Sequence, residues 1–245
     1  HAGQESDLAL GTRLRKTYAS SLVAAAVTQN HLRGKAVMKF GEDAAQMYFT
    51  HDALEQSTRQ RVATHRATRL ASTGAEAVVD LGCGIGGDLV ALARAGLRVR
   101  GVELDPVRAA IAAANLRALG LDGEVISADV KSVKIGRDEV AFIDPARRDG
   151  RGRTFSTADL QPPWDWVRLL LEGRAAAKVM PGLAHDAVPH GVDAEWVSDG
   201  GDLVEACLWG APFATATRRA TVLPSGAGLA SIGEPVALAQ PGTYI

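Results

Sequence analysis

The residues best suited to do chemistry follow one short apolar run, at residues 78–88. The run ends in an acid, Asp80, and continues into Gly82, Gly84 and Gly86, a glycine at every second position. This pattern predicts a strand, a tight turn and a helix start, which lets the backbone approach a ligand beside the helix N-terminus. An acid before the turn would repel a pyrophosphate. It would attract an aminoacyl ligand that carries ammonium and sulfonium charges.

The same glycines leave two other interpretations open. Gly82, Gly84 and Gly87 also satisfy the G-x-G-x-x-G pattern of nicotinamide dinucleotide sites, a pattern that is weak by itself. The turn could also be a glycine-rich connection with no ligand. What favours the aminoacyl ligand is the set of acids that follows at later strand ends.

Three further acids are expected at the ends of the next two strands. Glu103 closes the strand predicted over 97–106, about 20 residues after the turn, where α/β sites hold ribose hydroxyls. Asp105 precedes Pro106, so it can cap the next helix as well as contact a ligand. Asp129 closes a third strand, either as a ligand contact or as an ordinary turn residue.

The fourth predicted strand, over 139–143, delivers Asp144, Pro145 and Ala146 followed by Arg147 and Arg148. In open α/β sheets, ligands bind and reactions occur at the carboxyl edge of the strands. The D-P-A-R-R stretch is therefore the candidate reaction segment.

Composition limits the alternatives. The chain has 245 residues, 47% of them hydrophobic, and a net charge of -1, so no whole-molecule field draws it to nucleic acid or an anionic membrane. Two cysteines give no disulfide framework, and the histidines show no metal-ligand spacing. With no long apolar stretch and no signal-peptide pattern, we expect a soluble, cytoplasmic protein without a membrane or metal partner.

The first part of the chain is expected to be helical. Apolar residues recur at helical spacing before residue 30, a loop-like segment spans 38–50, and a second helix is predicted from about Leu54 to Leu70. On that second helix Arg61, His65 and Arg69 share a face, with other arginines (Arg59 and Arg66) on another side. Such a stripe is either a solvated helix face or a phosphate-contacting rim.

Downstream, a fifth strand is predicted over 175–182, and two runs over 195–198 and 203–209 flank a hairpin turn at 199–202. Residues 218–223 can add one more strand, and from 226 onward the chain is Gly-, Pro- and Ala-rich. We therefore expect an N-terminal helical subdomain over 1–72, a sheet domain over 73–225, and a linker over 226–245 that leads toward a further domain.

The strand-turn-helix with D-x-G-x-G-x-G resembles the first motif of class I S-adenosylmethionine (SAM) dependent methyltransferases. The resemblance implies an α/β fold with a Rossmann-like seven-stranded, mostly parallel sheet and an antiparallel C-terminal hairpin. It implies SAM as cofactor, with Glu103 on the ribose and Asp129 at the adenine amino group. The cofactor-binding residues expected are Asp80, Gly82, Cys83, Gly84, Gly86, Glu103, Leu104 and Asp129.

D-P-A-R-R, Met180-Pro181-Gly182 and the runs at 195–198 and 204–209 look like bacterial methyltransferases that carry a THUMP-like domain. Those are similar to the RNA cap guanine-N2 (trimethylguanosine synthase) group. The resemblance covers about residues 35 to 245 and implies methyl transfer to a nitrogen of an RNA base, in rRNA or tRNA.

The chain departs from the amino-methyltransferase pattern [D/N/S]-P-P-[Y/F/W], in which the aromatic stacks on the flipped base. Asp144 and Pro145 are kept, but Ala146 and Arg147 replace the second proline and the aromatic. An arginine can stack on a base through its guanidinium plane, so the expected catalytic residues are Asp144, Pro145 and Arg147. The aromatic can instead come from Pro162-Pro163-Trp164, which also reads as a helix start.

Two other function classes remain open. A non-catalytic SAM-fold module could bind RNA or a partner through its arginines, an idea favoured by the missing aromatic. A methyltransferase could also act on a protein or a small molecule.

Overall fold

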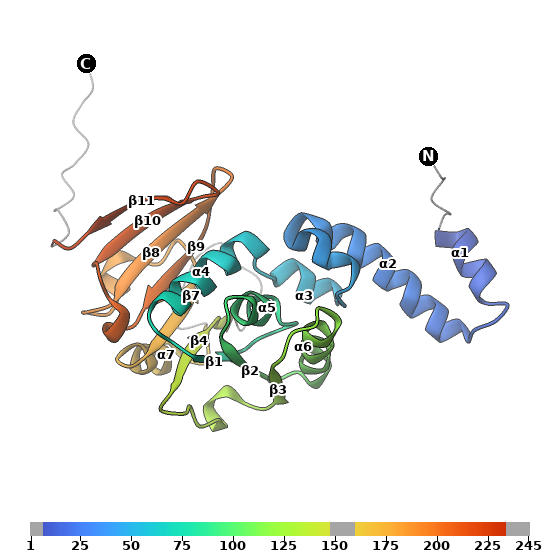
Figure 1. Ribbon diagram of the computed structural model, residues 1–245, viewed down its shortest axis with the longest axis horizontal. Helices are drawn as coiled ribbons and strands as arrows, with labels where there is room; N and C mark the ends of the chain where they lie inside the picture. Colours follow the sequence, from blue (N-terminus) through green and yellow to red (C-terminus); the bar gives the residue numbers. More distant parts are fainter. Residues whose placement is uncertain (1–6, 148–159, 234–245) are drawn as a thin grey trace, which may run out of the picture. The chain divides into compact units, whose positions relative to one another are not determined.

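The computed structural model describes residues 7–147 and 160–233. The chain forms two compact units, His1–Ala146 and Arg147–Ile245 (Figure 1). No helix among the described residues is both long enough and apolar enough to cross a membrane.

The first unit begins with helices, as predicted, but with a break that the periodicity did not indicate. The helix expected from Leu54 to Leu70 is two helices, because Ser57 has extended backbone (φ -64°, ψ 141°). The Lys39 ammonium donates to the carbonyl oxygens of Leu54 (2.8 Å), Glu55 (2.6 Å) and Ser57 (2.8 Å), which satisfies the end of the first of them. The helices are α1 (Asp7–Leu14), α2 (Ser20–Phe40), the 3-10 helix η1 (Gly41–Ala45), α3 (His51–Gln56) and α4 (Gln60–Ser72).

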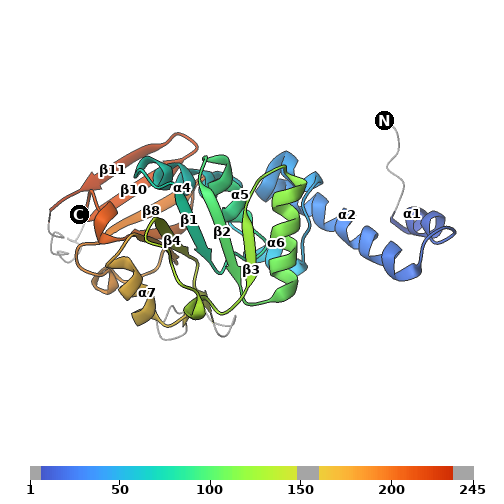
Figure 2. The ribbon, with the colours of Figure 1, turned by 60° about the horizontal axis from the view of Figure 1, so that its bottom comes forward.

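A parallel sheet follows, in the strand order β4-β1-β2-β3. Its strands are β1 (Ala77–Leu81), β2 (Arg98–Glu103), β3 (Glu124–Ser127) and β4 (Glu139–Ile143). The helices α5 (Gly87–Arg94) and α6 (Pro106–Ala118) connect them, and the 3-10 helix η2 (Val130–Ser132) follows β3. Figure 2 shows α6 lying along β2 and β3. All residues of β1 are buried, as expected for a central parallel strand, and the carboxyl ends of the four strands share one edge.

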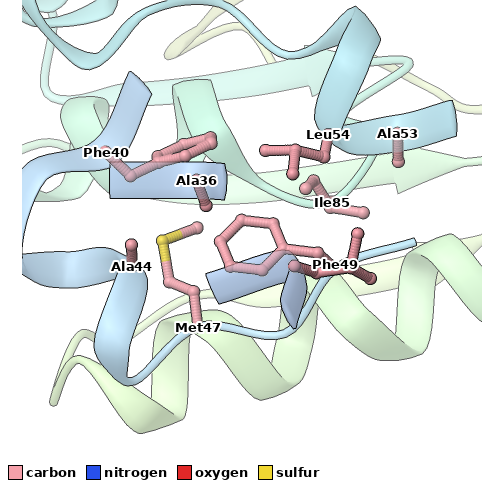
Figure 3. Packing of buried hydrophobic residues seen from close by; sticks show 9 residues of the cluster. Ala36, Phe40, Ala44, Met47, Phe49, Ala53, Leu54 and Ile85 are labelled. Atoms are coloured by element: carbon pink, nitrogen blue, oxygen red, sulfur yellow. The ribbon is translucent and has the colours of Figure 1, made fainter. Parts of the chain in front are cut away.

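The helical region is joined to this sheet by an apolar cluster. Phe40, Met47 and Phe49 pack with Ile85, which lies in the glycine turn (Figure 3). Residues 47–50 belong to neither a helix nor a strand, whereas α2 continues to Phe40 through the start of the segment expected to be a loop. The buried Asn115 of α6 fixes this connecting segment from the other side. Its amide group accepts from the backbone N–H of Tyr48 (2.7 Å) and donates to the carbonyls of Tyr48 (3.1 Å) and Ile85 (2.8 Å).

The second unit has the strand order β11-β10-β8-β9-β7. The predicted hairpin is confirmed, because β8 and β9 pair antiparallel through the turn at 199–202. The elements after β4 are β5 (Ala146–Arg147), β6 (Leu160–Gln161), α7 (Trp164–Leu171), β7 (Ala175–Val179), η4 (His185–Ala187), β8 (Asp193–Asp199), β9 (Asp202–Trp209), η5 (Ala211–Phe213), β10 (Arg218–Leu223) and β11 (Ala227–Ser231).

The mixed α/β fold with an antiparallel C-terminal hairpin is confirmed, but among the described residues the strands in the two orders above number nine, four in the first unit and five in the second, where seven were expected. Strand β10 pairs parallel with β8, and Ala227–Ser231 folds back on β10 where a linker was expected. Gly226 makes this return possible with φ 72°, and its N–H donates to the carbonyl of Val222 (2.9 Å). The glycine- and alanine-rich composition hid an exposed edge strand, because such strands need no apolar face. Residues 234–245 of the expected linker lie outside the described residues.

Candidate active site

The glycine turn has the conformation that its spacing predicts. Gly82, Gly84 and Gly86 all have positive φ, at 90°, 57° and 86°. The N–H groups of Gly82 and Cys83 donate to the carbonyl of Val102 at 2.8 and 3.0 Å, which holds the turn against the end of β2. Such φ values strain any residue with a Cβ, so the alternating glycines are a backbone requirement.

Asp80, near the end of β1, is 1% exposed, and its Oδ2 atom has no hydrogen-bond partner among the described residues. Burial raises the pKa of this carboxyl well above its usual range, and the charges of Asp88, Asp144 and Glu103 act in the same direction. The Arg66 guanidinium opposes them. A buried carboxylate oxygen without a partner fits a cationic group such as the SAM ammonium.

Glu103 lies where β2 ends, and its carboxylate is held in place from two sides. One oxygen accepts from the N–H of Gly84 (2.9 Å) and the other from the N–H of Asp105 (3.0 Å). Each carboxylate oxygen can accept a second hydrogen bond, so the half-buried group can still bind two hydroxyls. Asp105 caps α6 by accepting from the N–H groups of Val107 (2.7 Å) and Arg108 (3.2 Å), which confirms its capping role.

Two more predicted contacts lie at the same strand edge. Leu104 is 69% exposed, an apolar side chain that is open to a ring. Asp129 follows β3 and caps η2 by accepting from the N–H of Lys131 (2.9 Å). Asp129 is thus a turn residue, as one of the two predictions held, and its exposed carboxylate can still accept further hydrogen bonds.

The candidate reaction segment follows β4. Asp144 and Pro145 are half-buried, and the Asp144 carbonyl oxygen lies 3.6 Å from the place that a Cβ on Gly82 would occupy. The end of β4 therefore meets the glycine turn. Arg147 ends the short β5, while Arg148, Arg151 and Arg153 lie outside the described residues. In the second unit Pro163 is the N-cap of α7. The segment Pro162-Pro163-Trp164 is therefore a helix start, which was one of the two predictions for it.

The sequence interpretation missed Arg66. The sequence places it on another side of the helix from the Arg61 stripe and gives it no role, but it is 2% exposed and pairs with Asp88 in the first turn of α5. Its guanidinium carbon lies 4.7 Å from the ring centroid of Phe142 in β4. A signal was present, because its neighbours on the helix face are apolar and buried (Val62, Ala63, Ala67 and Leu70). The predicted rim remains a prediction: Arg61 is exposed, and His65 and Arg69 are half-buried.

In the parts of the chain that the structure describes, no group of histidine, cysteine and acidic side chains could hold a metal ion. The chemistry that these residues offer is recognition of a cationic, hydroxyl-bearing ligand beside a half-buried aspartate.

Comparisons with known proteins agree with this geometry. A family model described as a methyltransferase domain matches residues 78–143, and a domain of unknown function matches residues 1–36. An uncharacterized SAM-dependent methyltransferase of Mycobacterium tuberculosis is 40% identical over 206 residues, which cover 80% of this chain and 56% of that protein. The chain thus spans about half the length of this curated relative.

A second relative matches a shorter part. The ribosomal RNA small subunit methyltransferase C of Alcanivorax borkumensis is 30% identical over 106 residues, 43% of this chain and 32% of that protein. Among solved structures, a Porphyromonas gingivalis protein described as a methyltransferase superposes with a TM-score of 0.68 at 22% identity. That match covers 84% of this chain and 56% of the other and shows the fold.

The glycine turn, the acids at successive strand ends and these matches lead to one assignment. Residues 78–143 match a methyltransferase domain, and the chain is similar to SAM-dependent methyltransferases.

Proposed function

We propose that this protein transfers the methyl group of SAM to a nitrogen of an RNA base. The observation that carries the proposal is the place of Asp144, half-buried after β4 and against the glycine turn. SAM, when bound, supplies a methyl group on a positively charged sulfur. The residues of the chain bind it and aim the acceptor.

The described strand ends divide the binding of SAM among them. Asp80 would receive the aminoacyl ammonium with its unpartnered Oδ2, and Glu103 would accept from the ribose hydroxyls. Asp129 would meet the adenine amino group, and the exposed Leu104 side chain would contact the ring. Glu103 is already oriented by two backbone N–H groups, so little ordering is needed when the ligand binds.

The cysteines favour a nitrogen acceptor over a carbon acceptor. An unactivated pyrimidine carbon needs a nucleophile such as a thiolate, and the chain has only two cysteines. Cys83 and Cys207 are both buried, and burial raises the pKa of the Cys83 thiol. A thiol with a raised pKa does not ionise at neutral pH. An amine needs only orientation: Asp144 accepts from its N–H and can take the proton lost after transfer.

RNA is the substrate class that the sequence features support. D-P-A-R-R places arginines three and four residues after Asp144, and a guanidinium plane can stack on a base or bind phosphate. The relative named as a ribosomal RNA methyltransferase shares 30% identity over 106 residues. Methylation of a protein or small molecule, or a non-catalytic binding role, are the outcomes against which the proposal is tested.

The test is transfer of labelled methyl groups from SAM into RNA, protein and metabolite fractions from cells that lack the gene. We expect label in RNA, and an Asp144→Ala variant should be slower by about 100-fold or more with SAM affinity retained. Asp122→Ala is the matched control, because Asp122 is exposed and precedes β3 at the opposite edge of the sheet. Label in protein or metabolites alone would refute the RNA assignment, and binding of SAM without any transfer would indicate a non-catalytic module.

A further inference from the structure

A buried ion pair links the N-terminal helical region to the start of the cofactor site. Arg66 of α4 pairs with Asp88 of α5, with side chains 3% and 14% exposed. Its guanidinium carbon also lies 4.7 Å from the Phe142 ring centroid. Two contacts of a planar guanidinium fix both its position and its orientation.

The strand register places Asp80 on the same face as these contacts. Asp80 of β1 pairs in register with Phe142 of β4, and residues in register on neighbouring parallel strands project to the same side. Arg66, which packs on the Phe142 ring, therefore lies on the side to which the Asp80 carboxylate points.

The charges around Asp80 come from every neighbouring element. Asp88 is on α5, Asp144 follows β4, Glu103 ends β2, and the buried Cys83 thiol lies in the turn. All three carboxylates favour the protonated form of Asp80, whereas Arg66 on α4 favours the ionised form. A protonated Asp80 cannot make an ion pair with an ammonium.

We propose that Arg66 is a positioning residue for SAM: by pairing with Asp88 beside the Phe142 ring, Arg66 leaves the Asp80 carboxylate available for the aminoacyl ammonium. The inference rests on the proposed place of that ammonium at Asp80. It assigns a role in cofactor binding to a helix that lies outside the matched methyltransferase segment, 78–143.

The experiment compares ligands with and without the aminoacyl group at which Arg66 is proposed to act. SAM carries this group on a sulfonium, S-adenosylhomocysteine carries it on a neutral thioether and controls for the charge on sulfur, and 5′-methylthioadenosine lacks it. In an Arg66→Met variant, SAM should bind about tenfold or more weakly at pH 7, while methylthioadenosine affinity stays within about twofold of wild type. A general loosening of the fold would weaken the binding of all three ligands.

The pH profile tests the charge mechanism. Without the guanidinium, the pKa of Asp80 rises further, so SAM affinity of Arg66→Met should recover as the pH increases, with its midpoint above that of wild type. Asp88→Asn introduced into Arg66→Met removes one opposing charge and should restore part of the SAM affinity. Arg66→Lys keeps the charge, so it should retain more SAM affinity than Arg66→Met, and it serves if Arg66→Met does not fold.

The results separate the inference from the proposed function. If wild-type protein fails to bind SAM, the proposed function falls. Three results would refute the role of Arg66 if wild type binds SAM. Arg66→Met could lower the affinity for SAM and methylthioadenosine equally, lower the affinity for neither ligand, or leave the pH midpoint of SAM binding unchanged.

Discussion

Replacing Glu103 with alanine should weaken SAM binding while leaving the fold intact. The carboxylate of Glu103 is the proposed acceptor for the ribose hydroxyls. It also accepts from the N–H groups of Gly84 (2.9 Å) and Asp105 (3.0 Å). The substitution therefore affects both the affinity for SAM and the stability of the free protein, and the two effects can be measured separately.

The magnitudes follow from those contacts. A hydrogen bond to a charged group contributes about 1.5–3 kcal/mol, so loss of the ribose contacts should weaken SAM binding by about 10- to 100-fold. The two backbone donors are at a half-buried site where water can replace the carboxylate. The free energy of unfolding should fall by only about 1–2 kcal/mol.

Isothermal titration calorimetry of SAM gives the affinity, and urea denaturation gives the stability. Asp105→Ala is the control, because it removes the neighbouring acid that caps α6. It should lower stability by about 1 kcal/mol and leave SAM affinity unchanged. An unchanged SAM affinity in Glu103→Ala, or an equal loss in both variants, would refute the ribose assignment.

Three further predictions address the parts of the fold that support this site. Asn115→Ala should cost about 2–4 kcal/mol of unfolding free energy, because the fully buried amide makes three hydrogen bonds to backbone; a urea titration showing a loss below about 0.5 kcal/mol would contradict this. Cys83 and Cys207 are buried, so a thiol reagent should modify neither in the folded protein at pH 8 and both after unfolding; mass spectrometry showing rapid modification of folded protein would count against it. Arg100 lowers the pKa of Glu139 through hydrogen bonds of 2.9 and 2.6 Å, so their pair stabilises the fold above about pH 4 and this contribution is lost as the pH falls further. The stability difference between wild type and Glu139→Gln should therefore shrink from pH 6 to pH 3, and a constant difference would be inconsistent with the ion pair.

Local patterns in the sequence were sufficient to predict the strands and the turn that form the site. Glycine at alternating positions permits the positive φ values of a tight turn, and acids directly after apolar runs must lie at the carboxyl edge of a parallel sheet. Both inferences depend on residues close together in the chain, such as Asp80 and Gly82. The cap at Asp105 was predictable for the same reason, since Pro106 follows it.

What the sequence did not reveal depends on residues far apart in the chain. The break between α3 and α4 is stabilised by Lys39, which lies 18 residues before Ser57 in the sequence. Nothing in the residues next to Ser57 indicates that Lys39 contacts it. The burial of Arg66 depends on Asp88 and Phe142, each on a different element. A charged residue on an apolar helix face was the one available signal, and helical periodicity alone does not say what lies opposite.

The most direct test of the account is to identify the methylated nucleoside. RNA from cells that lack the gene is incubated with the protein and labelled SAM, digested, and analysed by mass spectrometry, with the Asp144→Ala variant in parallel. We expect one new nucleoside with its methyl group on a base nitrogen, formed by wild type and reduced about 100-fold or more in the variant. A methyl group on carbon or on ribose, or wild-type turnover in Asp144→Ala, would contradict it.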